Sequence, residues 1–173
     1  YLELCRKGLY GPALKLITEK NALPFITGTI CAHRCQGKCS RNFYEESVHI
    51  RDTKLLAAQK GYNALMASIK LPERVEGKRV AIIGGGPAGL SAAYYLAQMG
   101  YKPTVFEKNP IPGGMMTYGI PSYKLEKDVI AAEIDIIKAL GAEIKCGVEV
   151  GKDVTIDELK KQGYKAFYIA IGC

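Results

Sequence analysis

The sequence has no long apolar run, since no stretch approaches the roughly 20 residues that a membrane-spanning helix needs. Its first residues also lack the charged start and the apolar core of a secretory signal peptide. These absences argue against a membrane protein and against export, so we expect a cytoplasmic protein. They also argue against a disulfide framework, although the chain of 173 residues has 6 cysteines.

The sequence also lacks the side-chain combinations of several common catalysts. It has only 2 histidines, shows no Ser-His-Asp constellation, and has no C-x2-C pair of the kind that redox-active dithiols use. We therefore expect no catalytic acid, base or nucleophile from this chain. Any redox chemistry would be carried by a cofactor that the protein positions and shields.

A basic excess gives the chain a net charge of +7 and lies in its first half. Residues 1–79 hold 14 Lys and Arg against 7 Asp and Glu, whereas residues 80–173 hold 10 of each. The basic side chains surround cysteines, without the aromatic or groove-reading elements of a nucleic-acid interface. Nucleic acid is therefore not an expected partner.

The apolar periodicity changes abruptly at residue 79. Before it, steps of three and four residues predict helices over 9–19 and 52–71, separated by an irregular segment over 24–50. After it, short apolar runs alternate with helical patterns. The expected strands are 79–83, 104–106, 142–145 and 166–171, and the expected helices are 90–99, 129–140 and 155–162. Such alternation predicts a parallel sheet with right-handed crossovers.

We therefore expect an α/β protein in which a small, mostly α-helical, cysteine-containing domain precedes a Rossmann-like parallel sheet. The expected helical domain covers residues 1–71, a linker covers 72–78, and the Rossmann-like domain covers 79–173. Because the chain opens at Tyr1 and not at a methionine, we expect both domains to be incomplete parts of a longer protein.

A glycine-rich motif follows the first predicted strand and satisfies G-x-G-x-x-G at a strand-to-helix turn. Its residues are Gly84, Gly85, Gly86, Pro87, Ala88 and Gly89. In this motif the first glycine permits the tight turn, the second admits a pyrophosphate against the backbone, and the third lets helix and strand pack closely. The free amides of the helix start would face the phosphate charge. The alternative is that the glycines only make a turn.

Glu107 ends the second predicted strand, 18 residues past Gly89. A carboxylate at this place accepts hydrogen bonds from ribose hydroxyls in dinucleotide-binding domains. The motif and the acid together predict a dinucleotide site. The alternative for Glu107 is a solvated surface carboxylate.

The stretch from Gly84 to Gly100 resembles the extended fingerprint G-x-G-x-x-G-x3-A-x2-L-x3-G of FAD-binding oxidoreductases with two dinucleotide domains. Gly113 and Gly114 resemble the glycine pair that approaches the flavin side of the cofactor in those proteins. The segment from Ala170 to Gly172 resembles their later A-x-G. The resemblance favours FAD over NAD.

The stretch from Gly113 to Leu125 resembles the GG-x4-GIP-x2-[RK]-L pattern of the glutamate synthase small-subunit family, which includes the N-terminal half of dihydropyrimidine dehydrogenase. With the segments 30–41 and 50–52, the chain most resembles the branch that carries the name selenate reductase iron-sulfur subunit. The resemblance implies cofactor contacts for the pyrophosphate, the ribose, the flavin side and the adenine. Those positions are Gly86, Pro87, Ala88 and Gly89, then Glu107 and Lys108, then Gly114, Met115 and Lys124, and finally the Val150 backbone. Gly84 and Gly172 are further predicted cofactor-binding positions of the same motifs.

Three cysteines fall within nine residues as C-x3-C-x3-C, namely Cys31, Cys35 and Cys39. Thiolates in an irregular loop suit a soft metal or an iron-sulfur cluster. Zinc is the alternative, with His33 as a fourth ligand, although this crowding is unlike the separated ligand pairs of most zinc modules. The resemblance implies two 4Fe-4S clusters in the parent protein, with Cys39 serving one and Cys31 with Cys35 serving the other.

The resemblance implies an electron-transfer flavoprotein in which NAD(P)H reduces FAD, and iron-sulfur clusters carry the electrons to another oxidoreductase subunit. The sequence shows only one dinucleotide fingerprint, so the nicotinamide donor would bind in a C-terminal half that is missing here. Two alternatives remain open. One is a non-catalytic flavin-binding and subunit-docking module, and the other is a zinc-stabilised Rossmann protein that uses NAD.

Overall fold

The computed structural model describes residues 1–172, and the chain divides into two compact units, Tyr1–Ser68 and Ile69–Cys173. Each unit has its own hydrophobic core. We describe the two units separately.

The first unit is helical, and its core is a cluster of Cys5, Ala13, Ile17 and Ala57. The long helix α5 packs mainly against α2 and α3. In chain order the helices are α1 (Leu2–Arg6), α2 (Tyr10–Thr18), α3 (Pro24–Ile30), α4 (Arg34–Gly37), the 3-10 helix η1 (Ser40–Phe43) and α5 (Ile50–Ser68).

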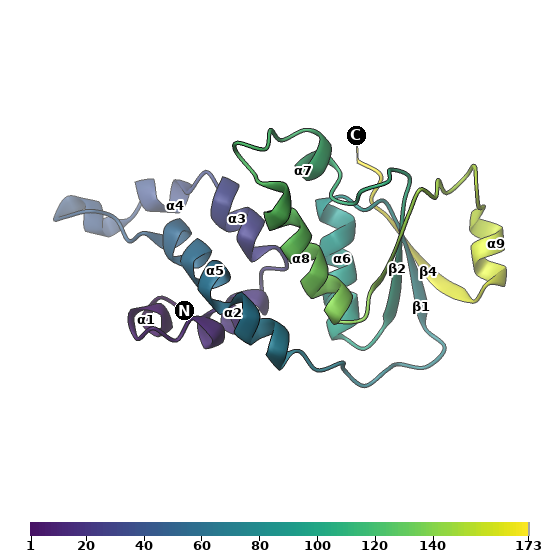
Figure 1. Ribbon diagram of the computed structural model, residues 1–173, viewed down its shortest axis with the longest axis horizontal. Coiled ribbons are helices and arrows are strands. Elements are labelled where there is room, and N and C mark those ends of the chain that lie inside the picture. Colours follow the sequence, from purple (N-terminus) through teal and green to yellow (C-terminus); the bar gives the residue numbers. More distant parts are fainter. Residues whose placement is uncertain (173) are drawn as a thin grey trace. The chain divides into compact units, whose positions relative to one another are not determined.

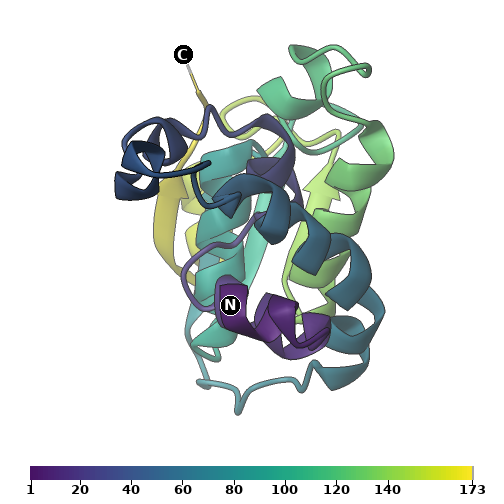
Figure 2. The same cartoon turned by 90° about the vertical axis from the view of Figure 1, so that its left-hand side faces the viewer.

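The expectation of an irregular segment over residues 24–50 is wrong for its first part. Pro24 opens α3 at the first helical position, where its fixed φ suits a helix and its missing N–H costs nothing. Cys31 then returns to extended backbone, with φ −60° and ψ 131°. The cysteine segment from Cys31 to His49, shown in blue, extends from one end of the helical unit in both views (Figures 1 and 2).

The second unit is built on a parallel sheet of four strands in the order β3-β2-β1-β4. Its strands are β1 (Arg79–Ile83), β2 (Lys102–Glu107), β3 (Glu143–Cys146) and β4 (Tyr164–Ile169). Its helices are α6 (Pro87–Gln98), α7 (Met115–Tyr118), α8 (Lys127–Ala139) and α9 (Ile156–Lys161). The predicted α/β class, with a Rossmann-like sheet after a helical domain, is confirmed.

Helices cover both faces of this sheet. Helix α6 packs against β1 and β2 and contacts α8, and Figure 1 shows these two helices on the same side of the strands. On the other face, Leu159 of α9 forms a buried cluster with Ala81, Phe106 and Tyr164. Because alternate side chains of β1 enter the two layers, Val80, Ala81 and Ile82 are all buried.

Strand β4 lies at one edge of the described sheet and differs from the other strands in exposure. Its side chains Tyr168 and Ile169 are 45% and 65% exposed. Its start is held by Arg79, whose guanidinium lies 4.2 Å from the ring centre of Tyr164 and donates to the Tyr164 hydroxyl at 2.8 Å. The strand is therefore anchored at Tyr164, its one buried residue, and exposed or partly exposed along the rest of its length.

None of the helices within residues 1–172 combines the length and apolar character needed to cross a bilayer.

Candidate functional site

The glycine-rich turn joins β1 to α6 and is held by backbone hydrogen bonds. Gly84 has φ 108° and donates its N–H to Phe106 O at 2.8 Å, which ties the turn to the end of β2. Gly86 is the N-cap residue of α6, with φ −78° and ψ −174°. Pro87 and Ala88 follow in the first turn of α6 and are exposed. The unpaired amides of this helix start therefore border the turn.

The glycines of this turn serve different purposes. A Cβ built on Gly89 would collide with the carbonyl oxygen of Gly84, so the third glycine is needed for the packing of helix against turn. A Cβ on Gly86 would meet only Gly114 Cα, at 3.9 Å. Gly86 therefore opens onto free space, and this is the position where the motif places a pyrophosphate.

Glu107 is buried at the end of β2, with 5% of the residue exposed. Its Oε2 accepts the N–H of Gly85 at 2.7 Å, and its Oε1 accepts the backbone N–H and the side-chain Nδ2 of Asn109 at 2.9 and 2.8 Å. The alternative of a solvated surface carboxylate is therefore wrong. Lys108, the other predicted ribose contact, is exposed beside it.

The second glycine pair lies directly against the glycine-rich turn. Gly113 donates its N–H to Gly85 O at 2.7 Å, and a Cβ on Gly114 would lie 2.8 Å from Gly86 Cα. Gly114 has φ 53° and caps α7, whose first residue, Met115, is exposed. The structure thus brings Gly114 and Met115 beside Gly86, although 28 residues separate the two glycines.

A lysine that sequence reasoning missed holds the end of helix α7. Lys127 Nζ donates to the carbonyl oxygens of Thr117, Ile120 and Met116 at 2.6, 3.1 and 3.4 Å. The Tyr118 hydroxyl bonds the backbone of Ile111, at 3.1 Å to both its N–H and its carbonyl. No sequence motif predicts these contacts. A cation that binds the carbonyls of a helix end can be identified only when the structure of the turn after the helix is known.

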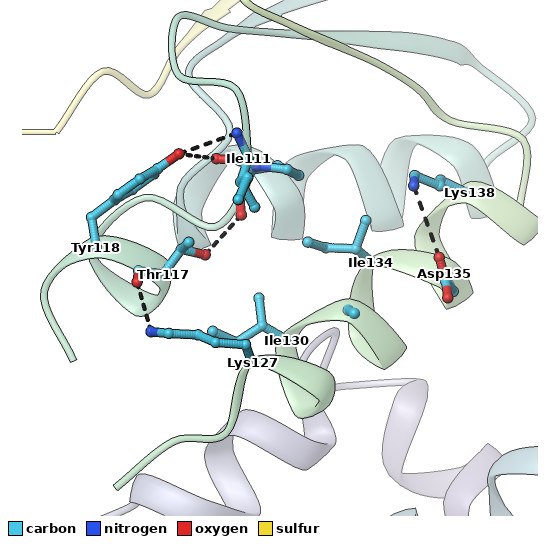
Figure 3. Close-up of a pocket in the computed structure, with 10 residues that line it drawn as sticks. Ile111, Thr117, Tyr118, Lys127, Ile130, Ile134, Asp135 and Lys138 are labelled. Atoms are coloured by element: carbon cyan, nitrogen blue, oxygen red, sulfur yellow. Dashed lines mark hydrogen bonds and ion pairs between the residues drawn. The ribbon is translucent and has the colours of Figure 1, made fainter. Parts of the chain in front are cut away.

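These residues border a cavity of about 400 Å³ on the second unit, shown in Figure 3. Ile111, Ile130 and Ile134 give it apolar walls, and Lys127 and Lys138 lie at its rim. The predicted cofactor residues do not line it. The cavity and the glycine-rich turn are therefore separate features.

The remaining predicted cofactor residues lie further along the unit. Lys124 is exposed after α7, and Val150 forms an isolated bridge with Val154 and packs against the cluster around Leu159. Gly172 follows β4 with φ 79° and is exposed. The neighbouring Ala170 donates its N–H to Ile83 O at 2.8 Å, which places the A-x-G segment beside the glycine-rich turn.

The cysteine segment carries thiols that reach the surface. Cys31 and Cys35 are exposed, Cys39 is partly exposed, and the five described cysteines are free thiols. His33 donates its N–H to Cys31 Sγ at 3.4 Å. Backbone N–H groups of Val48 and Arg41 lower the pKa of the Cys39 thiol by donating to its sulfur. Amide donation to thiolate sulfurs is a feature of iron-sulfur sites.

Gln36, which sequence reasoning also missed, ties the cysteine segment to helix α5. Its Oε1 accepts the N–H of Arg51 at 3.2 Å, and its carbonyl accepts Nδ2 of Asn42 at 2.9 Å. The one sequence feature that draws attention to Gln36 is its position between Cys35 and Cys39.

The two sites fit their expected groups to different degrees. The opening at Gly86, the helix start and the buried carboxylate fit the phosphates and ribose of a dinucleotide. In the cysteine segment the donors are suitable, but no three metal-ligating side chains within residues 1–172 converge on one point. The described residues therefore offer single cluster ligands and not a whole cluster site.

Comparison with known proteins relates both units to redox proteins. Residues 1–64 match the family described as dihydropyrimidine dehydrogenase domain II with a 4Fe-4S cluster, and residues 82–129 match the NAD(P)-binding Rossmann-like domain.

Relatives of the whole chain include subunits of three oxidoreductases. The chain is 39% identical to the NADP(+)-dependent formate dehydrogenase subunit beta of Moorella thermoacetica, over 99% of its length. It is 36% identical to the NADPH glutamate synthase small chain of Bacillus subtilis over 92%, and 36% identical to the NADPH-Fe(3+) oxidoreductase subunit beta of Geobacter sulfurreducens over 99%. It spans 27%, 32% and 26% of these relatives.

The relationship predicted from the sequence is thereby confirmed, while the narrower prediction of the selenate reductase branch stays a prediction. Over nearly its whole length, the chain is homologous to glutamate synthase small chains and related oxidoreductase subunits, and its first 64 residues match the iron-sulfur domain of dihydropyrimidine dehydrogenase.

Proposed function

We propose that this chain is the FAD-binding part of an NAD(P)H-dependent flavin and iron-sulfur oxidoreductase. The observation that carries the proposal is the open backbone at Gly86, between the start of α6 and the buried Glu107 carboxylate. The relatives support it, because their names describe NADPH-dependent oxidoreductase subunits.

FAD is the proposed dinucleotide, and NAD is the alternative. The Rossmann-like match by itself fits either cofactor. The second glycine pair favours FAD, because Gly114 packs on Gly86 and starts the short helix α7, which gives the far end of the cofactor a second backbone surface. We assign this end to the flavin, with Met115 and Lys124 as further contacts.

The residues of the chain would bind and orient the cofactor. The amides at the start of α6 would neutralise the pyrophosphate charge, and Glu107 would accept a ribose hydroxyl group. When bound, FAD supplies the capacity to take a hydride from a nicotinamide and to release electrons singly. Lys127 would keep α7 in place through the three carbonyls that it contacts.

We propose that Cys31, Cys35 and Cys39 ligate 4Fe-4S clusters in the larger protein, with other ligands from outside this chain. The thiols are exposed and backbone amides lie against Cys31 and Cys39, which supports ligation. Zinc is the competing metal, and metal analysis that finds zinc without iron would exclude the cluster assignment.

The donor and acceptor of the electrons belong to the larger protein. The chain spans about a quarter to a third of these relatives, so the NAD(P)H site and the partner subunit are proposed to lie beyond it. We place the protein in the cytoplasm, where thiols stay reduced. The alternative is a non-catalytic flavin-binding and docking module. Sequencing the parent gene separates the two: a stop codon after residue 173 would favour the module, and a second glycine fingerprint after it would favour the oxidoreductase.

A visible absorption spectrum of anaerobically purified protein, before and after dithionite, tests the proposal. We expect two flavin bands, with a broad bleachable shoulder if clusters assemble, and FAD released by acid. Flavin bands alone would support the dinucleotide site and leave the cysteines dependent on other ligands. A colourless protein that does not respond to added FAD or NADH would contradict the proposal.

A further inference from the structure

Asn109 makes two hydrogen bonds to one oxygen of the candidate ribose acid. Its backbone N–H and its side-chain Nδ2 both donate to Glu107 Oε1, at 2.9 and 2.8 Å. The other carboxylate oxygen accepts the N–H of Gly85 at 2.7 Å. Three donors therefore fix the plane of a buried carboxylate and occupy three of its four lone-pair sites, which leaves one site on Oε2 in a set direction.

The turn that carries Asn109 is itself tied to the end of β3. The Asn109 carbonyl accepts the N–H of Gly147 at 3.2 Å, and the Glu107 carbonyl accepts the N–H of Val148 at 3.0 Å. The Asn109 amide is therefore presented by a backbone that is anchored on both sides. An amide donor held in this way orients its acceptor at little further cost in side-chain entropy.

We propose that Asn109 is a positioning residue that holds the Glu107 carboxylate ready for the 2′-hydroxyl group of the adenosine ribose. The inference rests on the proposed dinucleotide site and adds a residue to which no motif assigns a role. An asparagine suits this task because its amide donates without carrying charge, whereas an aspartate there would face Glu107 with a second negative charge.

Few other titratable groups surround this carboxylate. Cys146 of β3 pairs in register with Glu107, and burial, followed by the Glu107 charge, raises the pKa of its thiol. The raised pKa moves the titration of this thiol further above the pH range of the test. Lys108 is the adjacent cation and is exposed, while the glycine-rich turn contributes no charged side chain. A pH effect between 5.5 and 8 in an Asn109→Asp variant would therefore come from the new carboxyl pair.

The test measures the affinity for FAD and for an FAD analogue that lacks the 2′-hydroxyl of the adenosine ribose. Flavin is removed from the purified chain and binding is followed by flavin fluorescence. The wild-type chain should prefer FAD by about tenfold, the effect of one good hydrogen bond to a charged acceptor. In Asn109→Leu the preference for FAD over the analogue should fall well below tenfold, because the carboxylate loses the side-chain amide, one of its three donors. A preference that survives in the variant would overturn the inference.

Asn109→Asp provides a second test with little change in shape. At pH 8 both carboxyl groups are ionised and repel each other, so FAD affinity should fall about tenfold or more. Toward pH 5.5 the pair shares a proton that can replace the amide donor, so the affinity should recover as the pH falls. Gln162→Glu, an amide-to-acid change at the exposed end of α9, is the matched control and should bind FAD as the wild type does.

The two proposals fail in different ways. A wild-type chain that binds neither FAD nor NADH would overturn both, because no ribose would then be present to contact Glu107. A wild-type chain that binds FAD, with an unchanged ribose preference in Asn109→Leu and a flat pH profile in Asn109→Asp, would overturn the positioning role alone. If NADH binds in place of FAD, the same variants are tested with NAD and its 2′-deoxy analogue.

Discussion

The glycine-rich turn of the second unit is made of backbone, whereas the cysteine segment of the first unit depends on side chains. At Gly86 the missing Cβ leaves space for a ligand, whereas at Gly84 and Gly89 it lets other backbone of the same fold pack against the turn. Around Cys31 and Cys35 the thiols are exposed. The first site is therefore shaped by folding alone, while the second needs its ligand and further donors to be complete.

The largest effect is expected where the turn itself is packed. Gly89→Val would place a branched side chain against the Gly84 carbonyl and the Ile82 side chain, so it should destabilise the second unit by about 3 kcal/mol or more. Thermal unfolding followed by circular dichroism measures this loss. An unchanged melting temperature would show that the turn is not a packed feature of the fold.

Gly86→Arg separates binding from folding at the same turn. Gly86 has a backbone conformation open to any residue, and its Cβ direction faces free space, so the variant should fold with a near-normal melting temperature. Its side chain would fill the place of the pyrophosphate and reduce FAD affinity by at least about 100-fold, close to 3 kcal/mol. Acid release and fluorescence of the flavin give the measurement, and retained flavin would mean that the dinucleotide binds elsewhere.

Cys39→Ser tests whether the cysteine segment binds an iron-sulfur cluster. The serine hydroxyl can accept the same backbone amides, so the melting temperature of the metal-free protein should not change. After anaerobic reconstitution with iron and sulfide, the variant should hold less iron than the wild type and the same amount of flavin. Cys146→Ser, which changes a cysteine of the other unit, is the control and should keep its iron.

The smallest effect is expected at a helix end that belongs to neither candidate site. The Thr155 backbone N–H and hydroxyl donate to Glu158 in the capping box of α9 and lower the pKa of its carboxyl. Because the folded pKa lies below the unfolded value, this contribution is present above pH 4.5 and is lost as the pH falls further. Glu158→Gln should therefore lower the melting temperature slightly at pH 7, and the difference should shrink as the pH falls below 4.5.

Much of the second unit was predictable from the sequence because its signals are local. The apolar run at Val80–Ile83, the glycines after it and the acid at position 107 each have a fixed place in a strand-turn-helix unit. The first unit was harder, because α3 is a short helix opened by Pro24 within a stretch that has no apolar period. Boundaries differed by a few residues, as for α6, which begins at Pro87 and not at residue 90.

The contacts that hold the candidate site were less accessible to sequence reasoning. The side chains of Asn109, Lys127 and Gln36 bond to groups that are 2 to 15 residues away, and such pairs have no periodic signature. The approach of Gly114 to Gly86 depends on how two turns meet in space. The motif therefore predicts the residues that form the turn better than those that support it.

The exposed half of strand β4 has a practical consequence for work with this polypeptide. A strand with one described neighbour offers unpaired N–H and C=O groups along its outer edge, and Ile169 and Ile171 add apolar surface at 65% and 73% exposure. Edges of this kind recruit strands from other molecules and promote aggregation. Expressed by itself, the chain should become less soluble as its concentration rises, and a charged substitution such as Ile169→Lys should improve its yield without altering the glycine-rich turn.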